Sequence, residues 1–389
     1  MTATTVAAFS ASLDATVMKK VLPIVKKLCG RSNNPITQNI LLSAGAGVLN
    51  LTVTDLDVAF TGPVGTSRGD GSVLITPEWL TGALTLEVEG QKAIVKGANN
   101  SRELKCADPE EYPLTFPKTE FDYWCTLCDA EKFLGAVRGT VAHCALEKGR
   151  YALNGVLFEL EASKLGFCGT DGRRLAYRRI DALGRAEKGF KADFKERGTT
   201  KYQVIVPSKV LNLLPQFSKL AEGELGMAIN ENRISFSRGH YMLRSLLVEG
   251  QFPDWRHVIP KDLDNPVIFE REAAIAAFTE ARKYTSIETQ AVRLEFGVNN
   301  RPRPDDPVTT KGLIWRTMSP AHGQACGELQ LQTVPPPVAI GFDPSYLLAG
   351  LEDFEGRYVA LELKDKETGA ILHDGHKEDA FFLCMPIDI

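Results

Sequence analysis

A recurring order of apolar and polar positions divides the chain into three similar segments. In each, a short apolar run leads to a proline, and leucines then follow at the spacing of helical turns, in VLITPEWLTGAL (73–84), VIVPSKVLNLLPQF (204–217) and IGFDPSYLLAGLEDF (340–354). Proline suits the first turn of a helix, because its missing N–H would have no intrahelical partner there. The pattern therefore predicts a strand followed by a helix in all three segments.

Two more features repeat in the same order. An amphipathic helix is predicted earlier in each segment, over 15–28, 130–146 and 271–285. Between the two helices, apolar residues alternate with polar ones, as in GVLNLTVTDLDVAF, and this period is typical of strands with one buried face. We therefore predict an α+β protein with three repeated domains, each with two helices packed on antiparallel sheet. The predicted domains are 1–124, 125–260 and 261–389.

The distribution of charge changes this picture more than its total. The chain holds 45 Lys and Arg against 49 Asp and Glu, which excludes a strong attraction of the whole surface for nucleic acid but permits a local basic face. The first helix of each segment is basic, through Lys19, Lys20, Lys26 and Lys27, then Lys132 and Arg138, then Arg271, Arg282 and Lys283. A solvated helix face explains any one of these residues. Their repetition on one element favours a shared channel for a polyanion.

Composition narrows the class of protein further. With 44% apolar and 24% charged residues the chain is globular, and no run approaches the roughly 18 apolar residues of a membrane span. The first twenty residues lack the pattern of a secretory signal, so we expect a cytoplasmic location. The eight cysteines include one close pair, Cys125 and Cys128, without a second pair at zinc spacing. We expect no metal and no cofactor.

Three aspartates raise the alternative of a hydrolase. Thr-Asp recurs directly after a strand at Asp55 and at Asp171, with Asp57 beside the first, and this position is typical of an aspartate that accepts hydrogen bonds in a turn. His373-Asp-Gly-His376 resembles a metal-binding pair, but Asp-Gly also favours a hairpin turn. We therefore expect structural roles for these residues and no catalytic activity.

Four motifs, in this order, carry a resemblance to a known family. They are Tyr151-Ala-Leu-Asn-Gly155, Thr170-Asp-Gly-Arg-Arg-Leu-Ala176, Phe252-Pro-Asp-Trp-Arg256 and Met385-Pro-Ile-Asp-Ile389. Together they resemble the beta sliding clamps of bacterial DNA polymerase III. The resemblance runs from end to end and weakens between about 295 and 335, and the polar stretches 183–202 and 297–312 look like expanded surface loops.

The resemblance implies a non-catalytic processivity factor. Two copies of the chain would associate head to tail and close a ring of six domains around duplex DNA. The ring would bind the duplex without recognising its base sequence. Its partners would be the polymerase catalytic subunit, the clamp loader and other proteins whose short peptides bind a groove between domains two and three. A duplicated or mobile-element clamp with altered partner or inhibitor specificity is the alternative.

The resemblance also implies site residues. For the peptide groove these are Leu153, Thr170, Gly172, Arg173, Arg174, Leu175, Pro253, His257, Val258, Leu383, Met385, Pro386 and Ile387. For DNA they are Arg31, Lys148, Arg150 and Tyr151, and for the dimer interface Lys283 and Tyr284. Arg173 stands where the family leads us to expect histidine, and the ending Asp388-Ile389 departs from a basic-apolar one. By strand alternation, Arg178 and Arg179 need not face the groove.

Overall fold

The computed structural model describes most of the chain. The described residues are 8–30, 34–113, 123–127, 129–147, 149–161, 164–181, 183–187, 202–263, 266–285, 291–297, 312–320, 323–333 and 337–388. The chain divides into two compact units. The first comprises Met1–Leu134, Leu160–Ser163 and Ala182–Glu249, and the second comprises Gly135–Glu159, Lys164–Asp181 and Gly250–Ile389. Each unit is described by itself.

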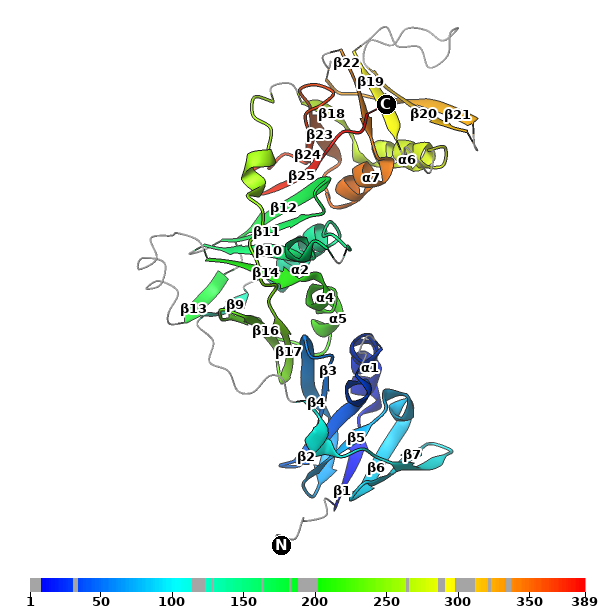
Figure 1. Cartoon of the computed structure of the whole chain (residues 1–389), viewed down its shortest axis with the longest axis vertical. Coiled ribbons are helices and arrows are strands. Elements are labelled where there is room, and N and C mark those ends of the chain that lie inside the picture. Colours follow the sequence, from blue (N-terminus) through cyan, green and yellow to red (C-terminus); the bar gives the residue numbers. More distant parts are fainter. Residues whose placement is uncertain are drawn as a thin grey trace. The chain divides into compact units, whose positions relative to one another are not determined.

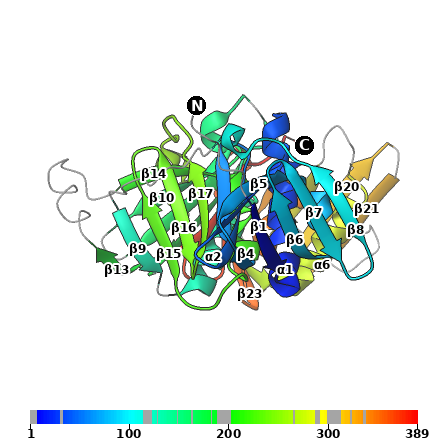
Figure 2. The same cartoon turned by 90° about the horizontal axis from the view of Figure 1, so that it is seen from below.

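The first unit is built on one antiparallel sheet. Its strands are β1 (Ala8–Leu13), β2 (Ile40–Gly45), β3 (Val48–Thr54), β4 (Val58–Arg68), β5 (Gly71–Ile75), β6 (Ala83–Glu89), β7 (Lys92–Gly97), β8 (Ser101–Lys105), β9 (Tyr123–Leu127), β13 (Leu183–Glu187), β15 (Leu225–Ile229), β16 (Arg233–Arg238) and β17 (Tyr241–Leu246). The unit also contains β14 (Tyr202–Pro207), which is not part of this sheet. Neighbours follow the order β13-β9-β15-β16-β17-β4-β1-β6-β7-β8, and β3, β2 and β5 branch from β4. Figure 2 shows the end of this run at β6, β7 and β8.

The helices of the first unit are short except for α1. They are α1 (Ala15–Cys29), η1 (Pro35–Gln38), η2 (Pro77–Leu80), η3 (Pro109–Glu111), α4 (Ser208–Leu211) and α5 (Leu214–Phe217), and α2 (Ala130–Val141) begins here and continues into the second unit. Asp14 Oδ1 caps α1 by accepting hydrogen bonds from the backbone N–H groups of Thr16 (2.8 Å) and Val17 (3.0 Å). Helix α1 packs on β3 and β4 (Figure 1).

The buried face of α1 agrees with the predicted apolar stripe. Val21, Ile24, Val25 and Leu28 are buried, while Val17 is only half-buried and Met18 takes its place in the core. The four lysines of the helix all lie on its exposed face. The helical period of 3.6 residues per turn therefore predicted correctly that α1 has one apolar face and one basic face.

The second unit contains two antiparallel sheets. Its strands are β10 (Gly155–Leu160), β11 (Leu165–Thr170), β12 (Arg174–Ile180), β18 (Val267–Glu270), β19 (Val292–Phe296), β20 (Gly312–Ser319), β21 (Gly323–Gln330), β22 (Val338–Phe342), β23 (Tyr358–Glu362), β24 (Ala370–His373) and β25 (Ala380–Cys384). One sheet follows the order β10-β11-β12-β25-β24-β23-β18, and the other follows β21-β20-β19-β22. The helices are η4 (Tyr151–Leu153), η5 (Trp255–Val258), α6 (Arg271–Arg282) and α7 (Pro344–Glu352).

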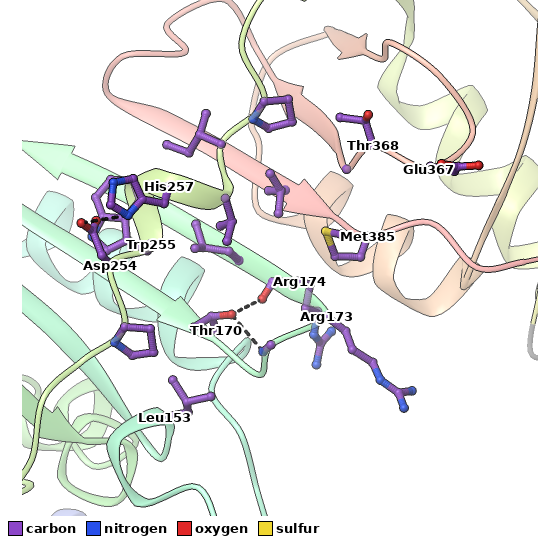
Figure 3. Close-up of a pocket in the computed structure, with 18 residues that line it drawn as sticks. Leu153, Thr170, Arg173, Arg174, Asp254, Trp255, His257, Glu367, Thr368 and Met385 are labelled. Carbon is purple, nitrogen blue, oxygen red and sulfur yellow. Dashed lines mark hydrogen bonds and ion pairs between the residues drawn. The ribbon is translucent and has the colours of Figure 1, made fainter.

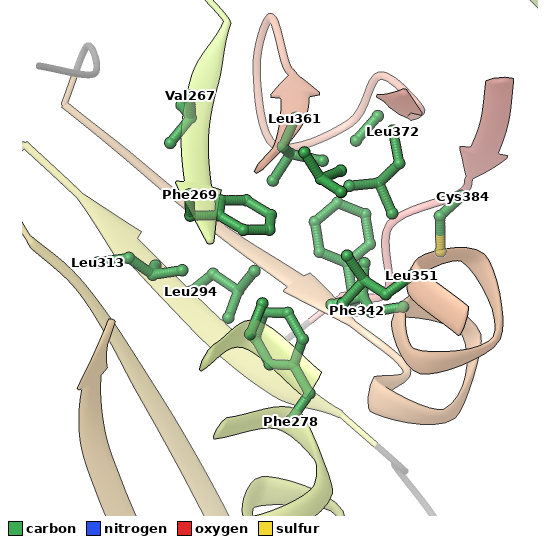
Figure 4. Packing of buried hydrophobic residues seen from close by; sticks show 14 of the residues in the cluster. Val267, Phe269, Phe278, Leu294, Leu313, Phe342, Leu351, Leu361, Leu372 and Cys384 are labelled. Carbon is green, nitrogen blue, oxygen red and sulfur yellow. The ribbon is translucent and has the colours of Figure 1, made fainter. Parts of the chain in front are cut away.

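The core of the second unit lies between its sheets and the helices α6 and α7. Phe269 of β18, Leu294 of β19 and Phe342 of β22 are buried there with Phe278 of α6 and Leu351 of α7. Their side chains point toward one another in Figure 4. Both sheets and both helices therefore share one apolar core.

Several predicted helices are shorter in the structure. Helix α2 ends at Val141 rather than at 146, because the backbone N–H of Ala145 already donates to Leu153 O (2.9 Å). Helix α6 ends at Arg282 rather than at 285. After Pro77 only one 3-10 turn forms, since Gly82 at φ +73 turns the chain into β6.

The helix predicted after Pro207 is interrupted. Two short pieces, α4 and α5, replace it, and Pro215 stands in the first turn of the second piece, where it lacks an N–H to continue the hydrogen-bond ladder. Only the third copy forms the expected helix. There Asp343 Oδ1 accepts from the backbone N–H of Ser345 (2.8 Å) and Pro344 occupies the first turn of α7.

Both Thr-Asp sequences form the predicted turns. Asp55 Oδ1 accepts from the backbone N–H groups of Asp57 (3.2 Å) and Val58 (2.9 Å), and Lys209 Nζ lies 2.6 Å from Asp55 Oδ2. The Asp-Gly sequence after His373 likewise lies in the connection between the paired strands β24 and β25, with Gly375 at φ +119. These turn predictions are confirmed.

Candidate functional site

The turn between β11 and β12 is held by its own side chains. Thr170 Oγ1 accepts from the backbone N–H of Gly172 (3.0 Å) and donates to Arg174 O (2.6 Å) (Figure 3). Asp171 Oδ1 accepts from the N–H groups of Arg173 (2.9 Å) and Arg174 (3.1 Å). A short Thr-Asp sequence can satisfy these bonds locally, so the turn is fixed before any partner binds.

Two observations favour glycine at position 172. Its φ of +90 lies in the region that side chains disfavour. In addition, a Cβ there would lie 2.9 Å from Nη1 of Arg150, which donates to Asp171 O (2.6 Å). Arg150, assigned to DNA by the resemblance, is therefore also a brace behind this turn.

Strand pairing joins the turn to the end of the chain. In the antiparallel pair of β12 and β25, Leu175 lies opposite Leu383, and the backbone N–H of Met385 donates to Arg173 O (2.9 Å). Leu175 and Leu383 are both buried. This register places apolar side chains from positions more than 200 residues apart on one floor.

The segment around η5, which precedes the third predicted domain, forms a wall beside this floor. The carboxylate of Glu159, 1% exposed, binds both terminal nitrogens of Arg256, at 2.8 Å to Nη1 and 2.6 Å to Nη2. The Arg256 guanidinium also lies 4.1 Å from the centre of the Trp255 ring. Trp255 in turn packs against Tyr177 and Phe381, at 4.6 and 6.1 Å between ring centres. These contacts hold η5, and with it His257 and Val258.

The result is a groove of about 460 Å³ within the second unit (Figure 3). We call it the groove from here on. The residues predicted for it that line it are Leu153, Thr170, Gly172, Arg173, Arg174, Leu175, Pro253, His257, Val258, Leu383 and Met385. Both the predicted domain 125–260 and the predicted domain 261–389 contribute to this lining.

Two of the predicted residues do not line the groove. The backbone N–H of Ile387 donates to Gly341 O (2.9 Å), so Pro386 and Ile387 run alongside β22 instead. Their part in peptide binding stays a prediction. The hydrogen bond anchors the tail, however, and thereby supports Met385.

The sequence prediction missed seven lining residues. They are Asp254, Trp255, Ile259, Pro260, Glu367, Thr368 and Gly369. The first four lie next to predicted residues in the sequence, and this adjacency is the signal that could have identified them. The last three belong to the loop between β23 and β24, and no local pattern indicates that this loop meets Met385, whose Sδ lies 3.1 Å from where a Cβ on Gly369 would be.

The two arginines that follow in β12 do not line the groove. Arg178 is buried, with Nη2 3.9 Å from Asp353 Oδ2 and its guanidinium over the Phe354 ring at 4.7 Å. Burial lowers the pKa of Arg178. Arg179 pairs with Asp379 at 2.8 Å. Neither arginine is among the residues that line the groove, as expected.

The residues predicted for DNA and for the dimer interface are only partly described. Arg31 and Lys148 lie outside the described residues. Tyr151 is 71% exposed, and Arg150 has the turn contact given above. Lys283 follows α6 and is exposed, with Nζ 2.6 Å from Glu280 Oε2, and Tyr284 beside it is half-buried. The groove does not include any of these described residues.

The thiols near the groove are unsuited to nucleophilic or ligand chemistry. Burial raises the pKa of Cys144 to about 12, with Asp171 contributing, and burial also raises the pKa of Cys168 and Cys384. Cys128 lies outside the described residues. Within the described ranges no group of three or more His, Cys, Asp or Glu side chains could hold a metal ion. No helix in the described part of the chain is long and apolar enough to cross a membrane.

Comparison with known proteins gives consistent matches over the length of the chain. Residues 14–116 match the family description "DNA polymerase III beta subunit, N-terminal domain", and residues 128–254 match "DNA polymerase III beta subunit, central domain". Together these matches cover more than half of the chain.

Individual relatives extend the likeness. The beta sliding clamp of Pseudomonas putida is 26% identical over 368 residues, covering 92% of this chain and 93% of its own. That of Escherichia coli K12 is 25% identical over 385 residues, covering 95% and 97%. The crystal structure of the DNA polymerase III subunit beta from Pseudomonas aeruginosa has a TM-score of 0.84 at 25% identity, covering 98% of this chain and 100% of its own. Matching motifs, fold and length together show that the chain belongs to the family of bacterial DNA polymerase III beta subunits, the beta sliding clamps.

Proposed function

We propose that the groove is the site where this clamp binds short peptides of replication proteins, while a ring formed by two copies encloses duplex DNA. The single observation that carries the peptide site is the apolar floor built from β12, β25 and η5 and open at its rim. Sites that bind ligands commonly combine such a floor with a few placed polar groups. Glycine at 172 lets a peptide approach the backbone, and Met385 offers an adaptable surface.

As a beta sliding clamp, the protein is a non-catalytic processivity factor of DNA polymerase III. The relatives support this function and do not support the alternative of a duplicated or mobile-element clamp. The aspartates considered for a hydrolase are engaged in turns instead. The partners that we infer are duplex DNA, the polymerase catalytic subunit, the clamp loader and a second copy of the chain, and the location that we infer is the cytoplasm.

The proposed peptide site is tested by titrating a Gln-Leu-x-Leu-Phe peptide into the protein in a calorimeter. Two large apolar side chains entering the groove would contribute about 1.5 to 3 kcal/mol each. After ordering costs, and with backbone contacts, we expect a total near −8 kcal/mol and a micromolar Kd. If no heat of binding is observed at peptide concentrations tens of times above that Kd, the assignment is wrong.

The DNA contacts are proposed at Arg31, Lys148, Arg150 and Tyr151, supported by the exposed lysine face of α1. Retention by a ring requires only loose phosphate contacts, which agrees with a net charge of −4. We expect the double variant Arg31→Ala, Lys148→Ala to weaken duplex binding and to reduce the salt slope by roughly 0.9 for each lost contact. Fluorescence anisotropy on a duplex measures this.

Sequence preference for the duplex should not change in that variant. Arg150 needs a separate measurement because it also braces the turn at Gly172. Binding identical to that of the parent at every salt concentration would contradict the assigned DNA residues.

Dimerisation is supported by two sheet edges that no other described strand covers. Strand β8 ends the sheet of the first unit, and β21 ends the smaller sheet of the second, against which α6 packs. An edge strand exposes backbone groups that pairing with a second copy would satisfy. We propose a head-to-tail contact between domains one and three, with Lys283 and Tyr284 near the seam.

Light scattering is expected to give about twice 42.7 kDa for the parent. The variant Tyr284→Glu should yield folded monomers, because a charge placed in the contact leaves the core of the unit intact. Circular dichroism checks its fold. A monomeric parent at micromolar concentration would contradict the dimer, and a dimeric variant would move the seam away from Tyr284.

A further inference from the structure

Two charged side chains on the rim of the groove have no ion-pair partner among the described residues. They are Arg173, next to the turn at Gly172, and Glu367, in the loop between β23 and β24, and both are exposed. The other rim charges are engaged: Arg174 Nε lies 2.9 Å from Asp171 Oδ2, and His257 Nδ1 lies 3.3 Å from Asp254 Oδ2. Among the described lining residues, Arg173 and Glu367 are therefore the charged side chains without any ion-pair contact.

The backbone at both positions is fixed. Arg173 donates its N–H to Asp171 Oδ1 (2.9 Å), and its carbonyl accepts from Met385 N (2.9 Å). Glu367 donates its N–H to Asp365 Oδ1 (2.9 Å), as its neighbour Thr368 does (2.7 Å). In Figure 3, Arg173 and Glu367 lie on opposite sides of Met385. The two opposite charges thus flank one wall of the apolar floor at positions that the fold holds in place.

We propose that the groove reads the charge pattern of its peptide, with Arg173 binding an acidic side chain and Glu367 a basic one while apolar residues occupy the floor. This inference rests on the proposed peptide function of the groove. A guanidinium can bind a carboxylate through two parallel hydrogen bonds. Complementary rim charges determine specificity and association rate more than total affinity. A fixed backbone also reduces the ordering cost of each contact.

The opposite signs make the readout directional. A peptide with an acidic residue at one end of its apolar motif and a basic residue at the other matches the groove in one arrangement, and its charge-swapped isomer meets two like charges. Arg173 replaces the histidine expected at this position, so the acidic preference distinguishes this chain from what the resemblance alone implies.

The test compares three peptides that share the motif Gln-Leu-x-Leu-Phe. One carries Asp before the motif and Lys after it, the second carries Lys before and Asp after, and the third carries Ser at both positions. Calorimetric titration at low salt should separate the two charged isomers by about threefold to tenfold in Kd, with the uncharged peptide between them. The separation should shrink at high salt, because these contacts are exposed.

The variant Arg173→Glu, Glu367→Lys should invert the order in which the two charged isomers bind, because it exchanges the signs of the two rim charges. Glu378→Lys, an exposed charge reversal away from the groove, is the matched control and should preserve the parental order.

The outcomes separate this inference from the proposed function. If the Ser peptide binds but the two isomers bind equally at low salt, the charge readout is overturned and the peptide site stands. An order that the double variant fails to invert assigns the preference to other residues and also overturns it. If none of the three peptides binds the parent, both the inference and the proposed peptide site are wrong.

Discussion

Replacing Arg256 with alanine should lower the free energy of unfolding by about 3 kcal/mol, because it leaves the Glu159 carboxylate buried without its cation. The guanidinium is itself 41% exposed, so water can reach part of the vacated space, and the loss should lie near the lower end for broken buried pairs. The variant should also bind peptide more weakly, since Arg256 holds η5 and with it one wall of the groove. Chemical denaturation and peptide titration measure the two effects.

The second substitution Glu159→Gln provides the matched control. Added to Arg256→Ala, it should recover a large part of the lost stability, because an amide does not bury a charge. The deficit of the single variant should also shrink as the pH falls, since a buried carboxylate that has lost its guanidinium favours its protonated form. A single variant as stable as the parent at neutral pH would show that the pair contributes nothing to the fold.

Deleting residues 385–389 should abolish measurable peptide binding at micromolar concentrations. Met385 forms one wall of the groove, and losing the burial of such a side chain costs about 1.5 to 3 kcal/mol, or roughly a tenfold to hundredfold weaker Kd. The free energy of unfolding should fall by no more than about 2 kcal/mol, because two backbone hydrogen bonds, from Met385 and Ile387, hold the described part of this tail. Calorimetric titration and light scattering measure binding and dimer formation.

A shorter deletion, of residues 388 and 389 alone, is the control for this experiment. It retains both backbone hydrogen bonds and Met385, so peptide affinity should stay close to that of the parent. Undiminished affinity after the longer deletion would move the binding site elsewhere. A collapsed dimer would instead make the tail a structural element of the ring.

Features that depend on nearby residues followed from the sequence. The separation of lysines from the apolar stripe on α1 is a property of helical periodicity, and the turns at Asp55 and Asp171 rest on hydrogen bonds spanning two or three residues. A helix or a 3-10 turn follows each of the three prolines, because proline fits the first turn of a helix. Most of the groove residues were predicted from short sequence motifs that resemble those of a known family.

Features that depend on distant residues were decided by the tertiary structure. Glu159 stands in an alternating strand sequence and looks like a surface residue, yet Arg256, 97 positions later, makes it a buried partner. The loop with Glu367 reaches the groove only because β24 and β25 pair in one register, and Ile387 leaves the groove because its N–H finds Gly341 on β22. The sequence alone determined where the chain turns and which faces are apolar. Which charges those faces bury and which they leave free depends on pairings between segments far apart in the chain, and no local pattern encodes them.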